Sequence, residues 1–248
     1  MSFINSYEDP AYAKAYAKIE FPGTYYLAYR DLPRIISAHV NAGNALDFGC
    51  GAGRSARFLK KCGFHAIGAD ISESMIRMAK ENDPGGDYRV MANRDFSQFP
   101  HRSFDLVLAA FTFDNIPEKE NKIKILNGLR QLLKDNGIIV IIVSRPEIYT
   151  HEWASFSTKD FPENQYAKSG DKVKIIITDT GDRKPVEDIV WADADYLEIF
   201  AKSGLNAIEM HTPLARAEEP FAWINETEIS PWAVYVLKKT DRDFSCLK

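Results

Sequence analysis

The sequence has few cysteines and no long apolar run, and each of these absences excludes a class of protein. Its three cysteines, Cys50, Cys62 and Cys246, are odd in number and lack the spacing of metal ligands, so we expect free thiols and no metal site. No stretch approaches the roughly 18 apolar residues of a membrane span. The first residues also lack the basic and apolar regions of a signal peptide. We therefore expect a cytoplasmic protein.

An excess of basic residues is also missing. The chain has 31 Lys and Arg against 35 Asp and Glu, which gives a formal net charge of −4. Nucleic-acid-binding proteins usually carry a basic excess or a clustered basic face, so a nucleic-acid partner is disfavoured. A length of 248 residues suits one α/β domain with a sizeable core.

Apolar and amphipathic segments alternate from residue 45 to residue 143. We expect strands at 45–48, 64–70, 88–92, 104–110 and 138–143, with helices between them. The last of these strands is an unbroken β-branched run, which is typical of a strand buried on both faces. The alternation predicts an α/β fold with a doubly wound, mostly parallel sheet covered by helices.

Less regular segments flank this core. Helices are expected at 8–20 and 25–40, a helix at 195–203, and strands at 205–211 and 231–237. Between 144 and 185 the alternation fails, and strands at 172–178 and 186–192 lie among aromatic and polar residues. Long connections of this kind are often lids or binding segments, so we interpret it as an insertion over the mouth of the sheet, with a plain excursion as the alternative.

Three glycines at every second position mark the turn after the first strand. Gly49, Gly51 and Gly53 separate the apolar run from the helix that follows. Glycine tolerates positive φ and lets a ligand approach the backbone, while the first amides of a helix offer unpaired donors. Asp70 lies 21 positions after Gly49, at the tip of the second strand, where an acid can accept hydrogen bonds from both ribose hydroxyls.

Ribose recognition leaves two cofactor classes, the nicotinamide dinucleotides and S-adenosylmethionine. A dinucleotide turn usually reads Gly-x-Gly-x-x-Gly, whereas this chain has Gly-x-Gly-x-Gly preceded by Asp47. The spacing favours S-adenosylmethionine and leaves a nicotinamide oxidoreductase as an alternative.

Residues 46–53 (Leu-Asp-Phe-Gly-Cys-Gly-Ala-Gly) resemble the first motif of the class I S-adenosylmethionine-dependent methyltransferases. Residues 68–72 resemble their ribose motif, and residues 95–100 followed by 103–105 resemble their adenine-side segment. The resemblance implies a Rossmann-like, seven-stranded sheet whose last strand is antiparallel. The implied division of this single domain is an N-terminal helical lid (1–43), a cofactor-binding core (44–143), an insertion that caps the substrate (144–193) and the rest of the core (194–248).

The resemblance also implies a cofactor site. The glycine turn would hold the methionine part, Asp70 the ribose, and the backbone near Ala109 and Ala110 the amino group, while Arg30 would pair with the carboxylate. The full set of expected cofactor-binding residues is Asp47, Gly49, Cys50, Gly51, Gly53, Asp70, Ile71, Met75, Arg94, Asp95, Phe96, Ala109, Ala110 and Arg30.

The expected reaction is methyl transfer to an oxygen or nitrogen atom of a small organic molecule. Candidates for a general base are His151, Asp114, His211 and Tyr149, each of which is also explained as a surface or packing residue. Asn115 is either an acceptor-side residue or the cap of the following helix. Alternatives are a methyltransferase acting on RNA or protein and a non-catalytic binder of S-adenosylmethionine. We expect a monomer or homodimer without a membrane partner.

Overall fold

The computed structural model describes residues 20–91, 95–180 and 183–240. The helix expected at 8–20, apart from its last residue, lies outside the described residues, as do Arg94 and Cys246. None of the helices in the described ranges has the length and apolar character needed to cross a membrane.

A seven-stranded sheet forms the centre of the molecule, with strand order β3-β2-β1-β4-β5-β10-β9. Its strands are β1 (Gly43–Phe48), β2 (Phe64–Asp70), β3 (Asp87–Val90), β4 (Phe104–Ala110), β5 (Leu133–Ser144), β9 (Leu205–His211) and β10 (Trp232–Lys239). β1 pairs in parallel with β2 and β4, and β10 pairs antiparallel with both β5 and β9. The expected doubly wound sheet with an antiparallel last strand is therefore confirmed.

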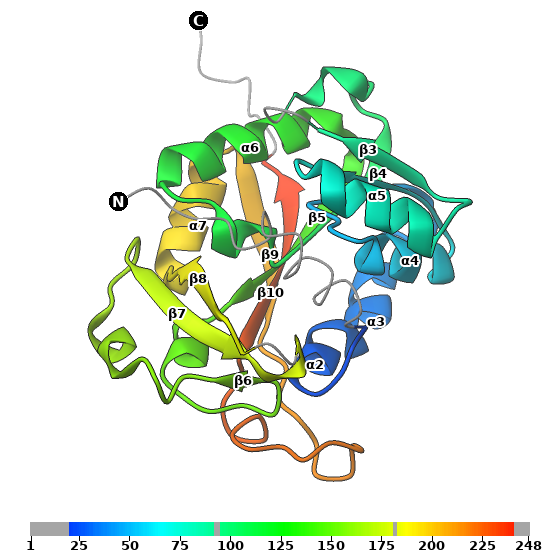
Figure 1. Ribbon diagram of the computed structural model, residues 1–248. Helices are drawn as coiled ribbons and strands as arrows, with labels where there is room; N and C mark the ends of the chain where they lie inside the picture. The colour runs from blue at the N-terminus through cyan, green and yellow to red at the C-terminus, as the bar shows by residue number, and fades with distance from the viewer. Residues whose placement is uncertain (1–19, 92–94, 181–182, 241–248) are drawn as a thin grey trace, which may run out of the picture.

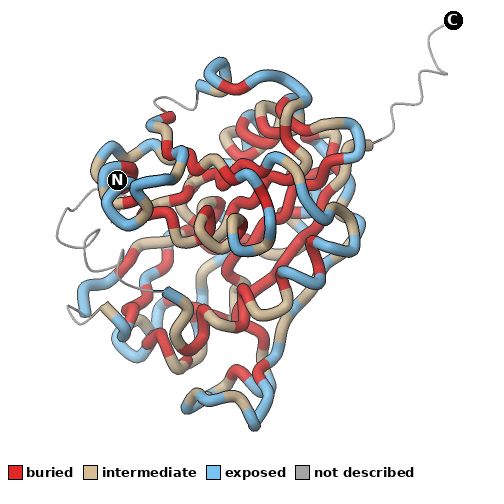
Figure 2. Tube along the Cα trace, turned by 90° about the vertical axis from the view of Figure 1, so that its right-hand side faces the viewer, coloured by how far each residue is buried: buried red, intermediate tan, exposed pale blue. Residues whose placement is uncertain are grey.

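Helices cover both faces of this sheet (Figure 1). One face carries α2 (Thr24–Arg30), α3 (Leu32–Ser37), α4 (Arg54–Lys61) and α5 (Glu73–Asn82), and the other carries α6 (Lys119–Leu132) and α7 (Asp193–Lys202). Alternate residues of each strand serve opposite faces, so Ala45 and Leu106 pack in the first core and Leu46 and Val107 in the second. Figure 2 shows the buried residues running through the central strands, with exposed residues on the outer loops.

Two boundaries differ from expectation. The helix expected at 25–40 is divided into α2 and α3 at Asp31, because Pro33 lies in the first turn of α3 and cannot donate a backbone hydrogen bond there. β5 begins at Leu133, before the expected start, and a register shift opposite Phe104 and Leu106 accommodates the extra residues before Ile138. Ser72 caps α5 as expected, since its Oγ accepts a hydrogen bond from the Met75 amide at 3.3 Å.

The segment after β5 forms a small antiparallel sheet of β6 (Phe156–Ser157), β7 (Lys172–Ile177) and β8 (Pro185–Ile189), in that order. The pair at 172–177 and 185–189 matches the two strands expected there, whereas β6 was not expected. Short 3₁₀ helices complete the fold at η3 (Phe96–Gln98), η4 (Thr112–Asn115), η5 (Pro146–Tyr149), η6 (Pro162–Tyr166) and η7 (Thr178–Thr180). The small sheet lies near α2 at the lower left of Figure 1.

Candidate active site

A pocket of about 850 Å³ opens at the carboxyl ends of β1, β2 and β4. This position, at the carboxyl ends of the strands, is where open α/β sheets bind ligands. Its walls are the glycine turn after β1, the residues around the end of β2 and the start of α5, and the segment after β4. The lining residues are Phe48, Gly49, Gly51, Ala69, Asp70, Ile71, Ser72, Met75, Met91, Ala110, Phe111, Thr112, Asn115 and Ile116.

The first two glycines of the turn serve different purposes. A Cβ on Gly49, whose φ is +74°, would lie 2.3 Å from Thr112 Oγ1, so the small residue is needed for the turn to pack against η4. Gly51 has φ +50°, and a Cβ there would meet no atom within 4 Å. Because Gly51 lines the pocket, the space in front of its backbone is open to a ligand.

Asp70 stands at the end of β2 and lines the same pocket. Its Oδ2 accepts a hydrogen bond from the Gly51 amide at 2.8 Å, and its Oδ1 accepts one from the Ser72 amide at 2.9 Å. Burial raises the pKa of this carboxyl, while the backbone N–H groups of Ser72 and Gly51 oppose the shift. Each oxygen keeps a second lone pair, so the side chain holds the turn in place and can still accept hydrogen bonds from a ligand.

Asp47, expected to bind the cofactor, is fully buried and does not line the pocket. Its Oδ2 accepts a hydrogen bond from Ser55 Oγ at 2.6 Å, and its Oδ1 has no hydrogen-bond partner among the described residues. Burial raises its pKa to about 7. Asp47 therefore supports the glycine turn and the first turn of α4 from beneath, which is a different role from direct ligand contact.

Several other expected residues also lie outside the lining. Cys50 is buried, and burial raises the pKa of its thiol, which disfavours a reactive thiolate. Gly53 precedes α4 with φ +85° and packs against Tyr88, and Ala109 is buried in the core between β4 and α6. The exposed Asp95 caps η3, and Phe96 stacks on Phe48 with ring centroids 6.1 Å apart. Among the described part of the expected set, Gly49, Gly51, Asp70, Ile71, Met75 and Ala110 line the pocket.

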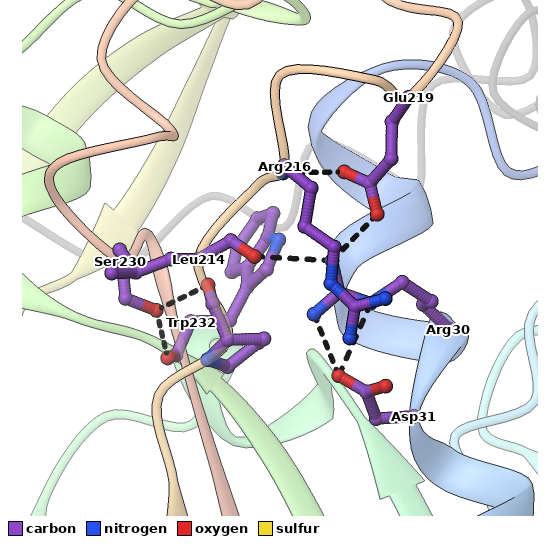
Figure 3. Close-up of polar contacts among 8 residues, drawn as sticks. Arg30, Asp31, Leu214, Arg216, Glu219, Ser230 and Trp232 are labelled. Atoms are coloured by element: carbon purple, nitrogen blue, oxygen red, sulfur yellow. Dashed lines mark hydrogen bonds and ion pairs between the residues drawn. The ribbon is translucent and has the colours of Figure 1, made fainter.

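Arg30 is placed elsewhere by the fold, and the expectation that it pairs with a cofactor carboxylate is not supported. Its guanidinium donates to Asp31 Oδ2 at 2.7 Å and to Glu219 Oε1 at 2.7 Å, and it also bonds the Leu214 carbonyl oxygen (Figure 3). Arg216 donates its amide to the same Glu219 side chain at 2.9 Å. Arg30 thus ties α2 to the loop before β10.

The four candidates for a general base divide into two groups. His151 hydrogen-bonds Thr150 Oγ1 at 3.0 Å, and His211 pairs with Glu209 at 2.7 Å; neither lines the pocket. Asp114 and Tyr149, in contrast, line a second, smaller cavity beside the pocket. Phe111 and Asn115 line both cavities, so the two spaces adjoin at the end of β4.

The second cavity lies between the end of β4, the end of β5 and the small sheet. Its aromatic wall consists of Tyr25, Phe111, Phe156 and Trp232. These rings contact one another, with centroids 4.8 Å apart for Phe111 and Trp232 and 5.1 Å apart for Tyr25 and Phe156. Phe111 adopts φ +63°, an unusual conformation for a bulky residue, which is characteristic of functional sites.

Two carboxylates meet in this cavity. Asp114 accepts hydrogen bonds from the Ser144 amide and from Ser144 Oγ, the latter at 2.9 Å. Asp188, on β8, accepts one from the Tyr149 hydroxyl at 3.2 Å. Burial raises the pKa values of both carboxyls; for Asp188 the negative charge of Asp114 adds to the effect, whereas Lys122 on α6 opposes it for Asp114.

Sequence reasoning missed Asp188, and it assigned no individual role to Phe111 or Thr112. Asp188 lies on β8, in an expected strand that carries no motif, and only the fold brings it to Tyr149, 39 residues earlier in the chain. Phe111 and Thr112 directly follow the expected strand at 104–110, and their position at a carboxyl strand end was the one available signal. Within the described ranges, no group of three or more His, Cys, Asp or Glu side chains could hold a metal ion.

Comparison with known proteins agrees with this geometry. A family model described as a methyltransferase domain matches residues 46–141. The demethylmenaquinone methyltransferase of Thermotoga maritima is 31% identical over 109 residues, which are 43% of this chain and 46% of that protein. The chain spans about half the length of the curated relatives it matches.

Solved structures show the same fold. A Pyrococcus horikoshii protein aligns with a TM-score of 0.63 at 18% identity, over 96% of this chain and 100% of that one. A S-adenosylmethionine-dependent methyltransferase from Methanosarcina mazei aligns with a TM-score of 0.60 at 16% identity, over 84% of this chain and 98% of that one. The family-model match agrees with the resemblance found in residues 46–53 and 68–72, and the solved structures confirm the fold.

Proposed function

We propose that this chain, whose residues 46–141 match the methyltransferase domain family, is an enzyme that transfers a methyl group from S-adenosylmethionine to a small organic molecule. The observation that carries the proposal is the arrangement of Gly51 and Asp70 around one pocket, next to a second cavity that shares its wall. The first space suits the cofactor and the second suits the methyl acceptor.

The residues around the first pocket fit the parts of S-adenosylmethionine. The open backbone at Gly51 would receive the methionine part, and the free lone pairs of Asp70 would accept the ribose hydroxyls. Ile71, Met75 and Met91 give the pocket an apolar side suited to adenine. When bound, the cofactor supplies a methyl group that its sulfonium makes electrophilic.

The protein's contribution is position and exclusion of water. Holding the acceptor in line with the methyl group can supply on the order of 7 to 11 kcal/mol of the barrier. The buried cavity formed by η4, η5 and β8 would keep water from the reacting atoms. This cavity is small, which supports an acceptor of small-molecule size over RNA or protein. Within the small-molecule class we propose an oxygen or nitrogen atom as the target.

Calorimetry with S-adenosylhomocysteine, followed by incubation with methyl-labelled S-adenosylmethionine and a fractionated metabolite extract, tests the proposal. We expect binding at a single site and transfer of label to a molecule of low molecular mass. Absence of binding would refute the cofactor assignment. Binding without labelling of any acceptor would favour a non-catalytic binder, and labelling confined to RNA or protein fractions would refute the acceptor class.

A further inference from the structure

The second cavity combines two carboxylates with an aromatic wall, and this combination restricts the acceptor. We propose that the methyl acceptor is a small amine, held with its nitrogen between Asp188 and the aromatic wall, and that Asp188 takes its proton. The inference rests on the proposed function and names the substrate class for the same site.

The polar atoms of the cavity accept hydrogen bonds more readily than they donate them. Asp114 and Asp188 both line it, and the described lining contains no Lys, Arg or His. Asn115 lies at the junction with the first pocket, and its Oδ1 is buried without a hydrogen-bond partner among the described residues. Its Nδ2 donates to the Phe111 carbonyl oxygen at 3.4 Å. A ligand that completes this site must bring donors, as an ammonium group does, whereas a carboxylate or phosphate would be repelled.

The two carboxylates differ in how far their hydrogen bonds are already made. Both Asp114 oxygens accept hydrogen bonds from Ser144, so this side chain is fixed at the end of β5. Asp188 has one bond, from the Tyr149 hydroxyl to Oδ2, lines the cavity and is less deeply buried than Asp114. Asp188 is therefore the carboxylate that is available to a ligand.

The aromatic wall favours the same class of acceptor. The Trp232 ring lies 5.6 Å from that of Phe156 and 6.0 Å from that of Tyr25, measured between centroids. Aromatic faces attract alkylammonium groups, and the attraction strengthens when the site is desolvated. Methylation of an amine keeps a cation in the cavity after proton exchange, so the wall stabilises both substrate and product.

The proposed step balances in atoms and charge. Asp188 accepts one proton from the bound ammonium, which exposes the nitrogen lone pair. This pair forms the N–C bond as the C–S bond of the sulfonium breaks and sulfur keeps the bonding electrons. The product leaves as a methylammonium ion, and Asp188 returns its proton to water. A carboxyl whose pKa is raised towards neutrality, as burial raises that of Asp188, is suited to this exchange.

The proposal predicts how the affinity for amines depends on pH. Asp188 is faced by Asp114 from η4, Tyr149 from η5 and Tyr196 from α7, with Glu187 beside it on β8. Its pKa is raised to about 8, so below that pH the empty site must lose a proton to bind an ammonium ion. Amine affinity should then rise about tenfold per pH unit below about pH 8 and level off above it. Asp114 also titrates, so the contribution of Asp188 is the difference between wild type and Asp188→Asn.

Calorimetry on the full chain saturated with S-adenosylhomocysteine tests this. The probes are benzylamine, phenethylamine and tryptamine. Each amine is compared with the alcohol in which a hydroxyl group replaces the amino group, and all three are compared with 4-methylphenol. We expect at least one amine to bind tenfold or more tightly than its alcohol and than the phenol. Asp188→Asn should abolish that preference and the part of the pH dependence near pH 8. Glu187→Gln, whose side chain pairs with Lys172 on the neighbouring strand, should keep the preference for the amine.

The outcomes separate this inference from the proposed function. If S-adenosylhomocysteine fails to bind, the proposed function is wrong. If it binds but no amine exceeds its alcohol, or if the preference survives Asp188→Asn, the amine assignment is wrong and the methyltransferase assignment stands. Retained affinity for S-adenosylhomocysteine shows that Asp188→Asn is folded, and Tyr149→Phe, which removes the hydrogen bond to Asp188, provides a second variant. The pH profile of the wild type requires no variant.

Discussion

Asp70→Ala should weaken S-adenosylhomocysteine binding by removing the acceptor of two ribose hydroxyls. In the free protein, each Asp70 oxygen already accepts one backbone N–H, from Gly51 at 2.8 Å and from Ser72 at 2.9 Å. Two further hydrogen bonds to a charged acceptor contribute about 1.5 to 3 kcal/mol each. The sum of about 3 to 6 kcal/mol corresponds to a loss of roughly 10²- to 10⁴-fold in affinity, measured by calorimetry.

The same substitution also releases the Gly51 and Ser72 amides, so the ribose contact must be separated from support of the turn. The analogue of S-adenosylhomocysteine that lacks both ribose hydroxyls makes this separation in a double-mutant cycle. Asp70→Ala should cost the analogue much less affinity than the parent ligand. Equal losses for both ligands would show that Asp70 acts only through the turn. Asp87→Asn is the matched control, because Asp87 is exposed and bonds Arg89 at the start of β3.

Three other substitutions test the surroundings of the two cavities. Gly51→Ala places a methyl group in the open space in front of the backbone, so we expect weaker S-adenosylhomocysteine binding by calorimetry. The φ of +50° should also lower stability by about 1 kcal/mol. Unchanged affinity would contradict the approach of a ligand to this backbone. Asp47 has a folded pKa of about 7, which is above its unfolded value. The free energy of unfolding should therefore fall by up to about 4 kcal/mol as pH rises from about 4 to about 7. Asp47→Asn keeps an acceptor for Ser55 and should remove this slope in urea unfolding. Burial lowers the pKa of Lys122 to about 7, so the free energy of unfolding should rise with pH between about 7 and the pKa of an unfolded lysine. Equal pH slopes in wild type and Lys122→Met would contradict a buried, titrating amine.

The sequence was informative where local chemistry decides structure. The glycine turn, the Ser72 cap and the β-branched run before Ser144 depend on conformational preference and on residues close in the chain, and all three occur as predicted. The position of Gly51 and Asp70 on one pocket followed from the same reasoning, because carboxyl ends of parallel strands meet at one edge.

Long-range contacts set the limit of that reasoning. Arg30 hydrogen-bonds Glu219, which is 189 residues away in the sequence. Of the partners of Arg30, only Asp31 is adjacent in the chain, so the sequence could indicate only that one. Asp188 acquires its surroundings from η4 and η5, and β6, with two residues, exists because it pairs with β7. The second cavity therefore depends on tertiary structure that propensity and periodicity do not encode.

Phe111 connects the two cavities and determines how independent they are. Its amide donates to the Ile142 carbonyl oxygen at 2.8 Å, its ring packs on Trp232, and its left-handed backbone conformation costs on the order of 1 to 3 kcal/mol. In this conformation Phe111 forms a wall of both cavities. Asp70 lines one cavity and Asp188 the other, so a change at either should weaken one ligand. A change at Phe111 should weaken both ligands together, since it moves the shared wall on which the alignment of donor and acceptor depends.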